Sequence, residues 1–213
     1  MEFEEFKHQI VKIKKMKLLG ESAQFKMAPK ERINELKKIA DVKKSAKKAG
    51  VLALFYPSVS KQTMLALILR KTYKGVHSAQ IGFPGGKFEA MDITLRVTAL
   101  RETEEEIGVN QNKVIVLKKL TEVYIPPSNF FVQPFLGYTN KTPNFILQED
   151  EVEDLIEVPL RHFMDDSIKS FQNFSTSYAK NIEVPVFNLN NHRVWGATAM
   201  MLSEVREMLK QLL

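Results

Sequence analysis

Apolar residues recur at helical spacing in three stretches of the chain. Near the N-terminus they stand at Phe3, Phe6, Ile10, Ile13 and Leu18, and after Pro29 they stand at Ile33, Leu36, Ile39 and Ala40. Near the other end, residues 197–213 carry Met200, Met201, Val205, Met208, Leu209 and Leu212. Because this spacing places apolar side chains on one helical face, we predict two N-terminal helices and a C-terminal helix that packs on the rest.

Short apolar runs in the middle of the chain predict β-strands. The runs at 51–56 and 64–69 flank a link that contains proline and serine, so they predict a hairpin of two buried strands. Further runs at 114–117, 130–138 and 182–189 predict three more strands. Helices and strands mix without a regular alternation, which favours an α+β fold over a mixed or antiparallel sheet.

The composition is typical of a globular protein with one core. The chain has 213 residues, of which 44% are hydrophobic. No apolar run reaches the roughly 18 residues of a membrane span, and the N-terminus lacks the basic-then-apolar order of a signal peptide. We therefore expect a cytoplasmic protein. The absence of cysteine excludes disulfides, thiolate metal sites and a cysteine nucleophile.

The positive charge of the chain is concentrated near its N-terminus. The net charge is +6, and residues 1–50 contain 14 lysines and arginines against 7 acids, while the remaining residues contain 17 against 18. Such a surplus would suit nucleic acid, an anionic membrane or a polyphosphate, but most charged runs are solvated helical faces. We favour the solvated face, and so expect neither membrane nor nucleic acid binding. The predicted organisation is a basic helical segment, residues 1–48, before a domain of residues 49–213.

The candidate chemistry lies in a loop and in the helix-forming segment that follows it. The stretch Gly82–Gly86 contains Pro84 and ends in two glycines, whose backbone can approach a metal ion or a phosphate without side-chain bulk. Asp92 then opens a segment that ends at Gly108, a residue typical of helix C-termini. We predict a loop that leads into a helix.

Three glutamates of this segment share one helical face. Glu102, Glu105 and Glu106 stand at positions i, i+3 and i+4, whereas Glu104 points away from them. Like charges at this spacing destabilise an isolated helix, and a hard divalent cation such as Mg²⁺ or Mn²⁺ compensates for them. The pattern indicates metal-assisted phosphate chemistry, with a solvated acidic helix as the alternative.

The stretch from Arg101 to Val109 resembles the second half of the Nudix hydrolase signature. It reads Arg-Glu-Thr-Glu-Glu-Glu-Ile-Gly-Val, and eight of the nine positions match by type, with Thr103 in place of an apolar residue. In the first half, Gly86 and Asp92 keep the expected six-residue relation, but one residue is inserted before Arg101 and Asp92 replaces a glutamate. The resemblance implies a Nudix-type α/β/α sandwich over a mixed sheet, here with an N-terminal helical extension.

Flanking motifs resemble the coenzyme A diphosphatase branch of that family. They are Leu67–Arg70, His77–Gly86 with Ala79 where the branch has glycine, Tyr124–Ser128, Val132-x-Pro134, Glu151-Val152, Val158–Leu160 and Val194–Ala199. The resemblance implies divalent-metal-dependent hydrolysis of the pyrophosphate bond in coenzyme A or its thioesters. The products would be 3′,5′-ADP and 4′-phosphopantetheine or its acyl form. Hydrolysis of another nucleoside diphosphate derivative, such as ADP-ribose or a dinucleoside polyphosphate, is the alternative, and a nucleic-acid-binding Nudix-fold module is a third.

The same resemblance gives roles to the acids. We expect Glu102 and Glu106 to bind the metal directly, with Glu105 as a third ligand or a base and the carbonyl of Gly86 as a backbone ligand. The candidate catalytic acids are Glu102, Glu105 and the distant Glu151. Glu105 and Glu151 both qualify as the general base, and their geometry decides between them.

Residues around the loop are candidates for contact with the nucleotide substrate. Arg70 suits two-point contact with the 3′-phosphate or the pyrophosphate, but it is equally a strand-end surface charge. His77 would meet a phosphate in front of the loop, although a structural histidine is the more common case. Gly85 and Gly86 offer backbone groups, and for Arg101 we favour ion pairing with the glutamates over substrate contact. A homodimer stays open.

Overall fold

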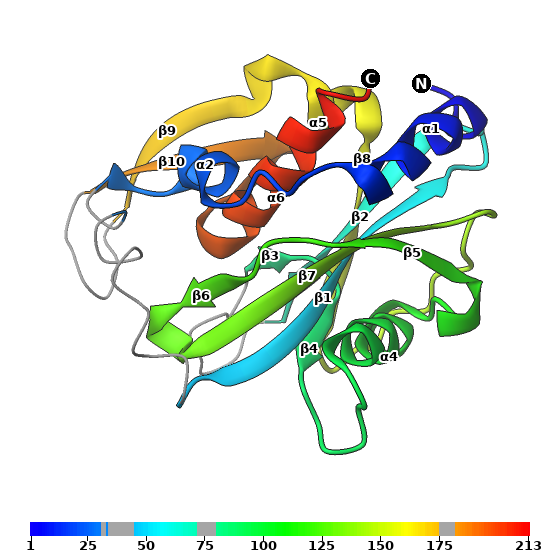
Figure 1. Ribbon diagram of the computed structural model, residues 1–213, viewed down its shortest axis with the longest axis horizontal. Helices are drawn as coiled ribbons and strands as arrows, with labels where there is room; N and C mark the ends of the chain where they lie inside the picture. Colours follow the sequence, from blue (N-terminus) through cyan, green and yellow to red (C-terminus); the bar gives the residue numbers. More distant parts are fainter. Residues whose placement is uncertain (31–32, 34–44, 72–79, 175–181) are drawn as a thin grey trace.

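A long mixed sheet runs through the middle of the protein (Figure 1). The computed structural model describes residues 1–30, 33, 45–71, 80–174 and 182–213. Within these residues the main sheet has eight strands, which are β1 (Lys47–Pro57), β2 (Thr63–Arg70), β3 (Ile81–Gly82), β4 (Gly85–Lys87), β5 (Val114–Lys119), β6 (Val123–Ile125), β7 (Phe130–Thr139) and β8 (Val152–Pro159). The central path is β3-β2-β1-β7-β5, while β4 pairs with β1, β6 with β7 and β8 with β2.

Strand β1 lies at the centre of this sheet and has neighbours of both directions. It forms an antiparallel hairpin with β2, in which Tyr56 stands opposite Met64. On its other side it runs parallel to β7, with Val51 opposite Pro134. A strand that is covered on both faces reads as a continuous apolar run, and the apolar stretch from Val51 to Tyr56 is buried throughout.

One face of the sheet is covered by helix α4 (Leu95–Ile107). The side chain of Thr94 caps its first turn by accepting a hydrogen bond from the amide of Val97 at 3.3 Å, and Gly108 ends it in the left-handed region with φ 72°. The helix lies directly on β1, because a Cβ atom at Gly50 would come within 2.2 Å of the carbonyl oxygen of Leu95. Only glycine fits at this crossing.

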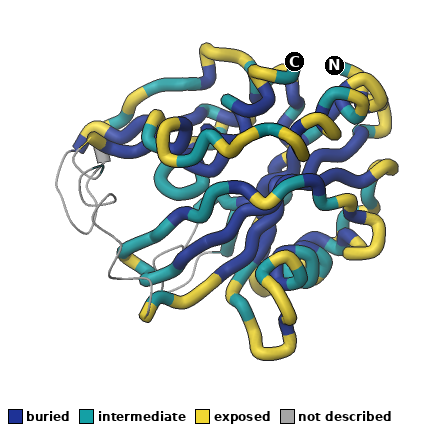
Figure 2. Tube along the Cα trace, in the orientation of Figure 1, coloured by how far each residue is buried: buried dark blue, intermediate teal, exposed yellow. Residues whose placement is uncertain are grey.

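The opposite face is covered by helices from the two ends of the chain and by a second sheet. The helices are α1 (Phe3–Ile10), α2 (Glu21–Gln24), α5 (Leu160–Met164) and α6 (Gly196–Leu209), and the 3₁₀ turns of the chain are η1 (Val11–Lys15), η2 (Phe25–Met27), η4 (Gln111–Lys113), η5 (Pro126–Ser128) and η6 (Asp166–Ile168). The second sheet consists, in the described chain, of β9 (Lys169–Phe174), β10 (Ile182–Leu189) and β11 (His192–Val194) in the order β11-β10-β9. Figure 2 shows the buried residues running between these layers.

The N-terminal helix is part of the main core. The side chains of Phe6, Ile10 and Ile13 are fully buried, and the ring of Phe6 lies 4.9 Å from that of Phe55 on β1. Among the described residues, no helix is long and apolar enough to cross a membrane.

A buried carboxylate fixes the N-terminal segment to the C-terminal helix. Both oxygens of Glu204 on α6 are used: Oε1 accepts hydrogen bonds from Gly20 N at 3.0 Å and Thr121 Oγ1 at 2.6 Å, and Oε2 accepts them from Gln24 Nε2 and Thr121 N, each at 3.1 Å. A fully buried charge is tolerated because its hydrogen bonds are satisfied. Three distant parts of the chain meet at this one side chain.

The predicted fold class is confirmed. The hairpin, the strands at 114–117, 130–138 and 182–189 and the C-terminal helix all form, and helix α4 begins at Leu95 rather than at Asp92. The first predicted N-terminal helix forms over Phe3–Ile10 and continues as a 3₁₀ turn, whereas the second lies outside the described residues except for Ile33, which is helical. The division of the chain at residue 48 stays a prediction.

Candidate active site

The two adjacent glycines of the loop form strand β4 and lie against helix α4. Gly85 has φ 141°, and a Cβ atom there would come within 2.4 Å of the carbonyl oxygen of Gly50. At Gly86 a Cβ atom would come within 2.4 Å of the carboxylate of Glu102. The missing side chains therefore allow the backbone of β4 to meet the acids of α4 directly.

Glu106 is buried at the centre of the site. Its Oε2 accepts a hydrogen bond from the Gly85 amide at 2.7 Å. Its Oε1 lies 3.1 Å from Arg70 Nη2, which makes an ion pair, but within the described chain it accepts no hydrogen bond. Burial raises the pKa of Glu106 to about 7, and the negative charges of Glu102 and Glu151 act in the same direction.

Arg70 connects the loop to this carboxylate. It stands at the end of β2, where the pairing with β8 shifts register. Its Nη2 donates a hydrogen bond to the carbonyl oxygen of Gly85 at 2.6 Å and lies next to Glu106. The guanidinium thus faces the acids. It is not a free surface charge at the end of the strand, which was the alternative prediction from the sequence.

Glu102 lies one turn before Glu106 and is the second acid of the site. Its carboxylate rests against Gly86, and its side chain is 13% exposed. Burial raises its pKa, while the ion pair with Arg101, at 3.0 Å, acts in the opposite direction. Burial thus raises the pKa of both acids that lie against the glycine loop, Glu102 and Glu106.

Arg101 holds three carboxylates at once. It binds Asp92 through Nε at 2.9 Å and Nη2 at 3.0 Å, Glu102 through Nη2 and Glu105 through Nη1 at 2.7 Å. Asp92 is buried, also accepts hydrogen bonds from Thr98 Oγ1 and the Glu89 amide, and has a pKa lowered to about 2, chiefly by the hydrogen bonds from Arg101. Asp92 therefore has a structural role: it fixes the orientation of Arg101 on helix α4.

Comparison with known proteins identifies the family. The model of the NUDIX domain matches residues 46–175, more than half of the chain. The chain belongs to the Nudix family. The prediction of a Nudix hydrolase, made from the glutamate stretch, is confirmed, and the segment that carries it is helix α4 with its preceding loop.

Relatives with curated names lie in the predicted branch. A Nudix protein from Caenorhabditis elegans named peroxisomal coenzyme A diphosphatase ndx-8 is 28% identical over 178 residues, which cover 80% of this chain and 74% of that protein. The human mitochondrial coenzyme A diphosphatase NUDT8 is 32% identical over 128 residues, which cover 60% of this chain and 54% of the human protein. The sequence therefore groups with the coenzyme A diphosphatase branch of Nudix proteins.

A solved structure supports the fold alone. The Nudix hydrolase RenU from M. smegmatis superposes with a TM-score of 0.53 at 13% identity, covering 79% of this chain and 88% of that chain. At this identity the similarity extends to the Nudix architecture only.

The donor atoms of the Nudix helix and loop suit a hard divalent cation. Glu106 Oε1 is buried and accepts no hydrogen bond from the described residues, and the carboxylate of Glu102 and the backbone of β4 lie nearby. In the described chain, however, three or more acids or histidines are not grouped closely enough to form a complete ligand set. The carboxylate of Glu105 is paired with Arg101 and its side chain is 53% exposed. The oxygen atoms of Glu106, Glu102 and β4 therefore suit Mg²⁺ or Mn²⁺, whereas Glu105 is paired with Arg101 in this structure.

The other sequence-predicted site residues have different positions. His77 lies outside the described residues. Glu151 is exposed at the start of β8, yet its charge is close enough to raise the pKa of both Glu102 and Glu106. The roles of these residues stay predictions. The ion pair between Arg70 and Glu106 has no local sequence signal, because 36 positions separate them.

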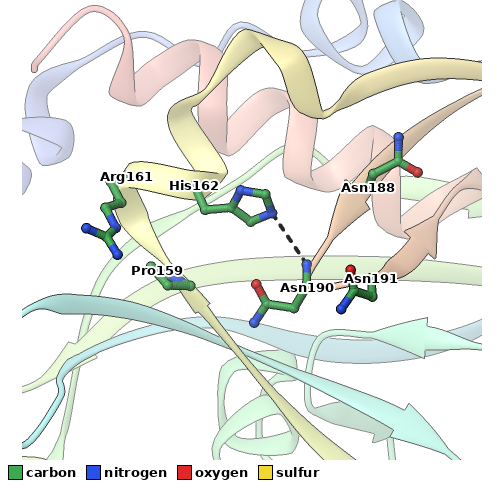
Figure 3. Close-up of a pocket in the computed structure, with 6 residues that line it drawn as sticks. All are labelled: Pro159, Arg161, His162, Asn188, Asn190 and Asn191. Atoms are coloured by element: carbon green, nitrogen blue, oxygen red, sulfur yellow. Dashed lines mark hydrogen bonds between the residues drawn. The ribbon is translucent and has the colours of Figure 1, made fainter.

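A large open cavity lies elsewhere. It has a volume of about 480 Å³ and is lined by Pro159, Arg161, His162, Asn188, Asn190 and Asn191 (Figure 3). Pro159 pairs with Met64 at one end of β2, whereas Arg70 pairs with Val152 at the other. Six residues of extended chain correspond to about 20 Å, so this cavity is separate from the glutamate site.

Proposed function

We propose that the protein hydrolyses the pyrophosphate bond of coenzyme A or its thioesters with Mg²⁺ or Mn²⁺, releasing 3′,5′-ADP and 4′-phosphopantetheine or its acyl form. The observation that carries the proposal is the buried carboxylate of Glu106, which lies beside the glycine loop and whose Oε1 accepts no hydrogen bond from the described residues. Natural proteins rarely leave a buried acceptor unused outside functional sites. The named relatives support coenzyme A as the substrate class.

The residues divide the work of the reaction between metal binding and substrate binding. Glu106, Glu102 and a backbone carbonyl of Gly85 or Gly86 would hold the ion. When bound, the ion supplies charge neutralisation for the pyrophosphate and lowers the pKa of the attacking water. Arg70 suits two-point contact with a phosphate. Arg101 holds Glu102 and Glu105 in place rather than reaching the substrate.

The general base comes from the two acids at the edge of the site. Glu105 is half exposed and its pairing with Arg101 keeps it on the face of α4 that carries Glu102. Glu151 is exposed and directly precedes β8, and its charge acts on both Glu102 and Glu106. We propose Glu105 as a third ligand or base, with Glu151 as the competing base, and the effect of each glutamine variant on the pH profile of turnover distinguishes them.

A hydrolysis panel tests the substrate. Coenzyme A, dephospho-coenzyme A, ADP-ribose and NADH are compared with Mg²⁺, with Mn²⁺ and with EDTA, and products are identified by chromatography. We expect the largest kcat/KM with coenzyme A, a lower value without the 3′-phosphate, and no turnover in EDTA. Preference for ADP-ribose would refute coenzyme A as the substrate while leaving the metal site intact.

The location and the oligomeric state of the protein remain predictions, namely cytoplasmic residence and a homodimer. The two named relatives carry peroxisomal and mitochondrial names.

A further inference from the structure

The position of Arg70 in this structure is the one that a bound cation would need. Its Nη2 lies 2.6 Å from the carbonyl oxygen of Gly85 and 3.1 Å from Glu106 Oε1. Both atoms are oxygens of the kind that hard divalent ions bind. One nitrogen of the protein therefore contacts a carbonyl and a carboxylate that the proposed function gives to the metal.

The contact between Arg70 and Glu106 has the geometry expected of an ion pair that can be replaced. Glu106 is fixed from its other oxygen by the Gly85 amide, so the carboxylate keeps its place when Arg70 leaves. Oε1 forms an ion pair with the guanidinium but no hydrogen bond within the described chain, so the contact lacks the directed geometry of the strongest pairs. Arg70 is 25% exposed, compared with 1% for Glu106, so the arginine has a route to solvent that the glutamate lacks.

We propose that Arg70 is an internal counter-ion that competes with the metal: without metal it neutralises Glu106, and metal binding displaces its guanidinium toward the substrate side. This inference rests on the metal site of the proposed function but not on the identity of the substrate. A buried carboxylate without a cationic partner is costly, so a carboxylate kept ready for a metal benefits from a temporary partner. The displaced guanidinium is then available for a phosphate.

Metal affinity in the absence of substrate tests the competition. Mn²⁺ binding is measured by the paramagnetic resonance of free Mn²⁺ in wild type and in Arg70→Met, which removes the charge and keeps an unbranched side chain. We expect Mn²⁺ to bind about tenfold more tightly to Arg70→Met, because the ion no longer displaces a charged partner. The matched control is Lys71→Met, since Lys71 is the next residue and pairs with exposed Glu153. Its affinity should change by less than about twofold.

A second measurement follows the Arg70 side chain itself in the wild-type protein. In protein labelled with ¹⁵N-arginine, addition of Mg²⁺ should move the Arg70 side-chain signal toward that of free arginine. The reference is the signal of Arg206 on α6, which binds Phe163, Met164 and Asp166 and none of the proposed metal ligands. Arg70→Met serves to assign the signal. Unchanged or weaker Mn²⁺ binding in Arg70→Met, or an Arg70 signal that Mg²⁺ leaves in place, would overturn the proposal. If Glu106→Gln binds Mn²⁺ as wild type does, the metal site is wrong and both proposals fail; a substrate other than coenzyme A affects only the proposed function.

Discussion

Two buried glutamates of this protein have the same side chain and nearly the same burial but opposite hydrogen bonding. Glu204 on α6 is fully buried, and four donors satisfy its two oxygens. Glu106 on α4 is 1% exposed, and one amide satisfies one oxygen while Arg70 lies near the other. A buried carboxylate with complete hydrogen bonding stabilises a fold, whereas one that has only an ion pair at one oxygen can exchange that partner for a ligand. Burial alone would not separate them.

The largest expected effect comes from removing the charge of the incompletely bonded acid. Glu106→Gln should lower kcat/KM by about a thousandfold, or about 4 kcal/mol of transition-state stabilisation, because an amide is a poor metal ligand. Steady-state kinetics with coenzyme A measures it, and the melting temperature checks that the fold persists. The matched control is Glu104→Gln on the same helix, whose carboxylate accepts a hydrogen bond from the Gln111 amide and should leave turnover near wild type. Near-normal activity in Glu106→Gln would contradict its role as ligand.

The completely bonded acid should show the reverse result. Glu204→Gln should lower the free energy of unfolding by about 3 kcal/mol, because an amide nitrogen would then face donors such as Thr121 N and Gly20 N. Urea denaturation measures this, and kcat per folded molecule should stay unchanged.

The control for this variant is Glu207→Gln, also on α6, whose ion pair with Lys26 lies at the surface. Its effect should stay below about 1 kcal/mol. A comparable loss of stability in both variants would show that the four hydrogen bonds of Glu204 have no special weight.

The smallest effect is a dependence of stability on pH in metal-free protein. The folded-state pKa of Glu106, about 7, lies above its unfolded value, so the folded protein takes up a proton first as the pH falls. Stability in EDTA should therefore rise by about 2 kcal/mol between pH 8 and pH 5.5 from this group. Thermal melts at the two pH values measure the change, and Glu106→Gln should lack it. Asp92, with a lowered pKa, contributes the opposite trend only below about pH 4.

The sequence predicted what depends on neighbouring positions. Helix α4 follows from the helix-forming segment between Asp92 and Gly108, and the hairpin of β1 and β2 follows from two apolar runs with a short link. The strand at Val152–Pro159 gave no such pattern, because exposed charged residues interrupt its apolar positions. Its place beside β2 comes from tertiary packing.

Contacts between distant residues were beyond the reach of these patterns. The glutamates on one face of α4 indicated a metal site, but the partners that distinguish them come from elsewhere in the chain. Arg70 is at the end of β2, and Thr121 meets Glu204 from 83 positions away. Asp92 looked like an irregular member of the signature, and its buried contact with Arg101 gives that substitution a structural role.

Gly50 sets the spacing between the glycine loop and helix α4 in the candidate site. It lies between Gly86, its partner across the sheet, and Leu95, whose carbonyl leaves no room for a methyl group. A larger residue at position 50 would raise the first turn of α4 and so change the separation between the glutamates and the glycine loop. Ion selectivity depends on that separation, since Mg²⁺ binds oxygen at shorter distances than Ca²⁺ does. The glycine at position 50 thus fixes the distance between the glutamates and the loop although it carries no group that could bind the ion.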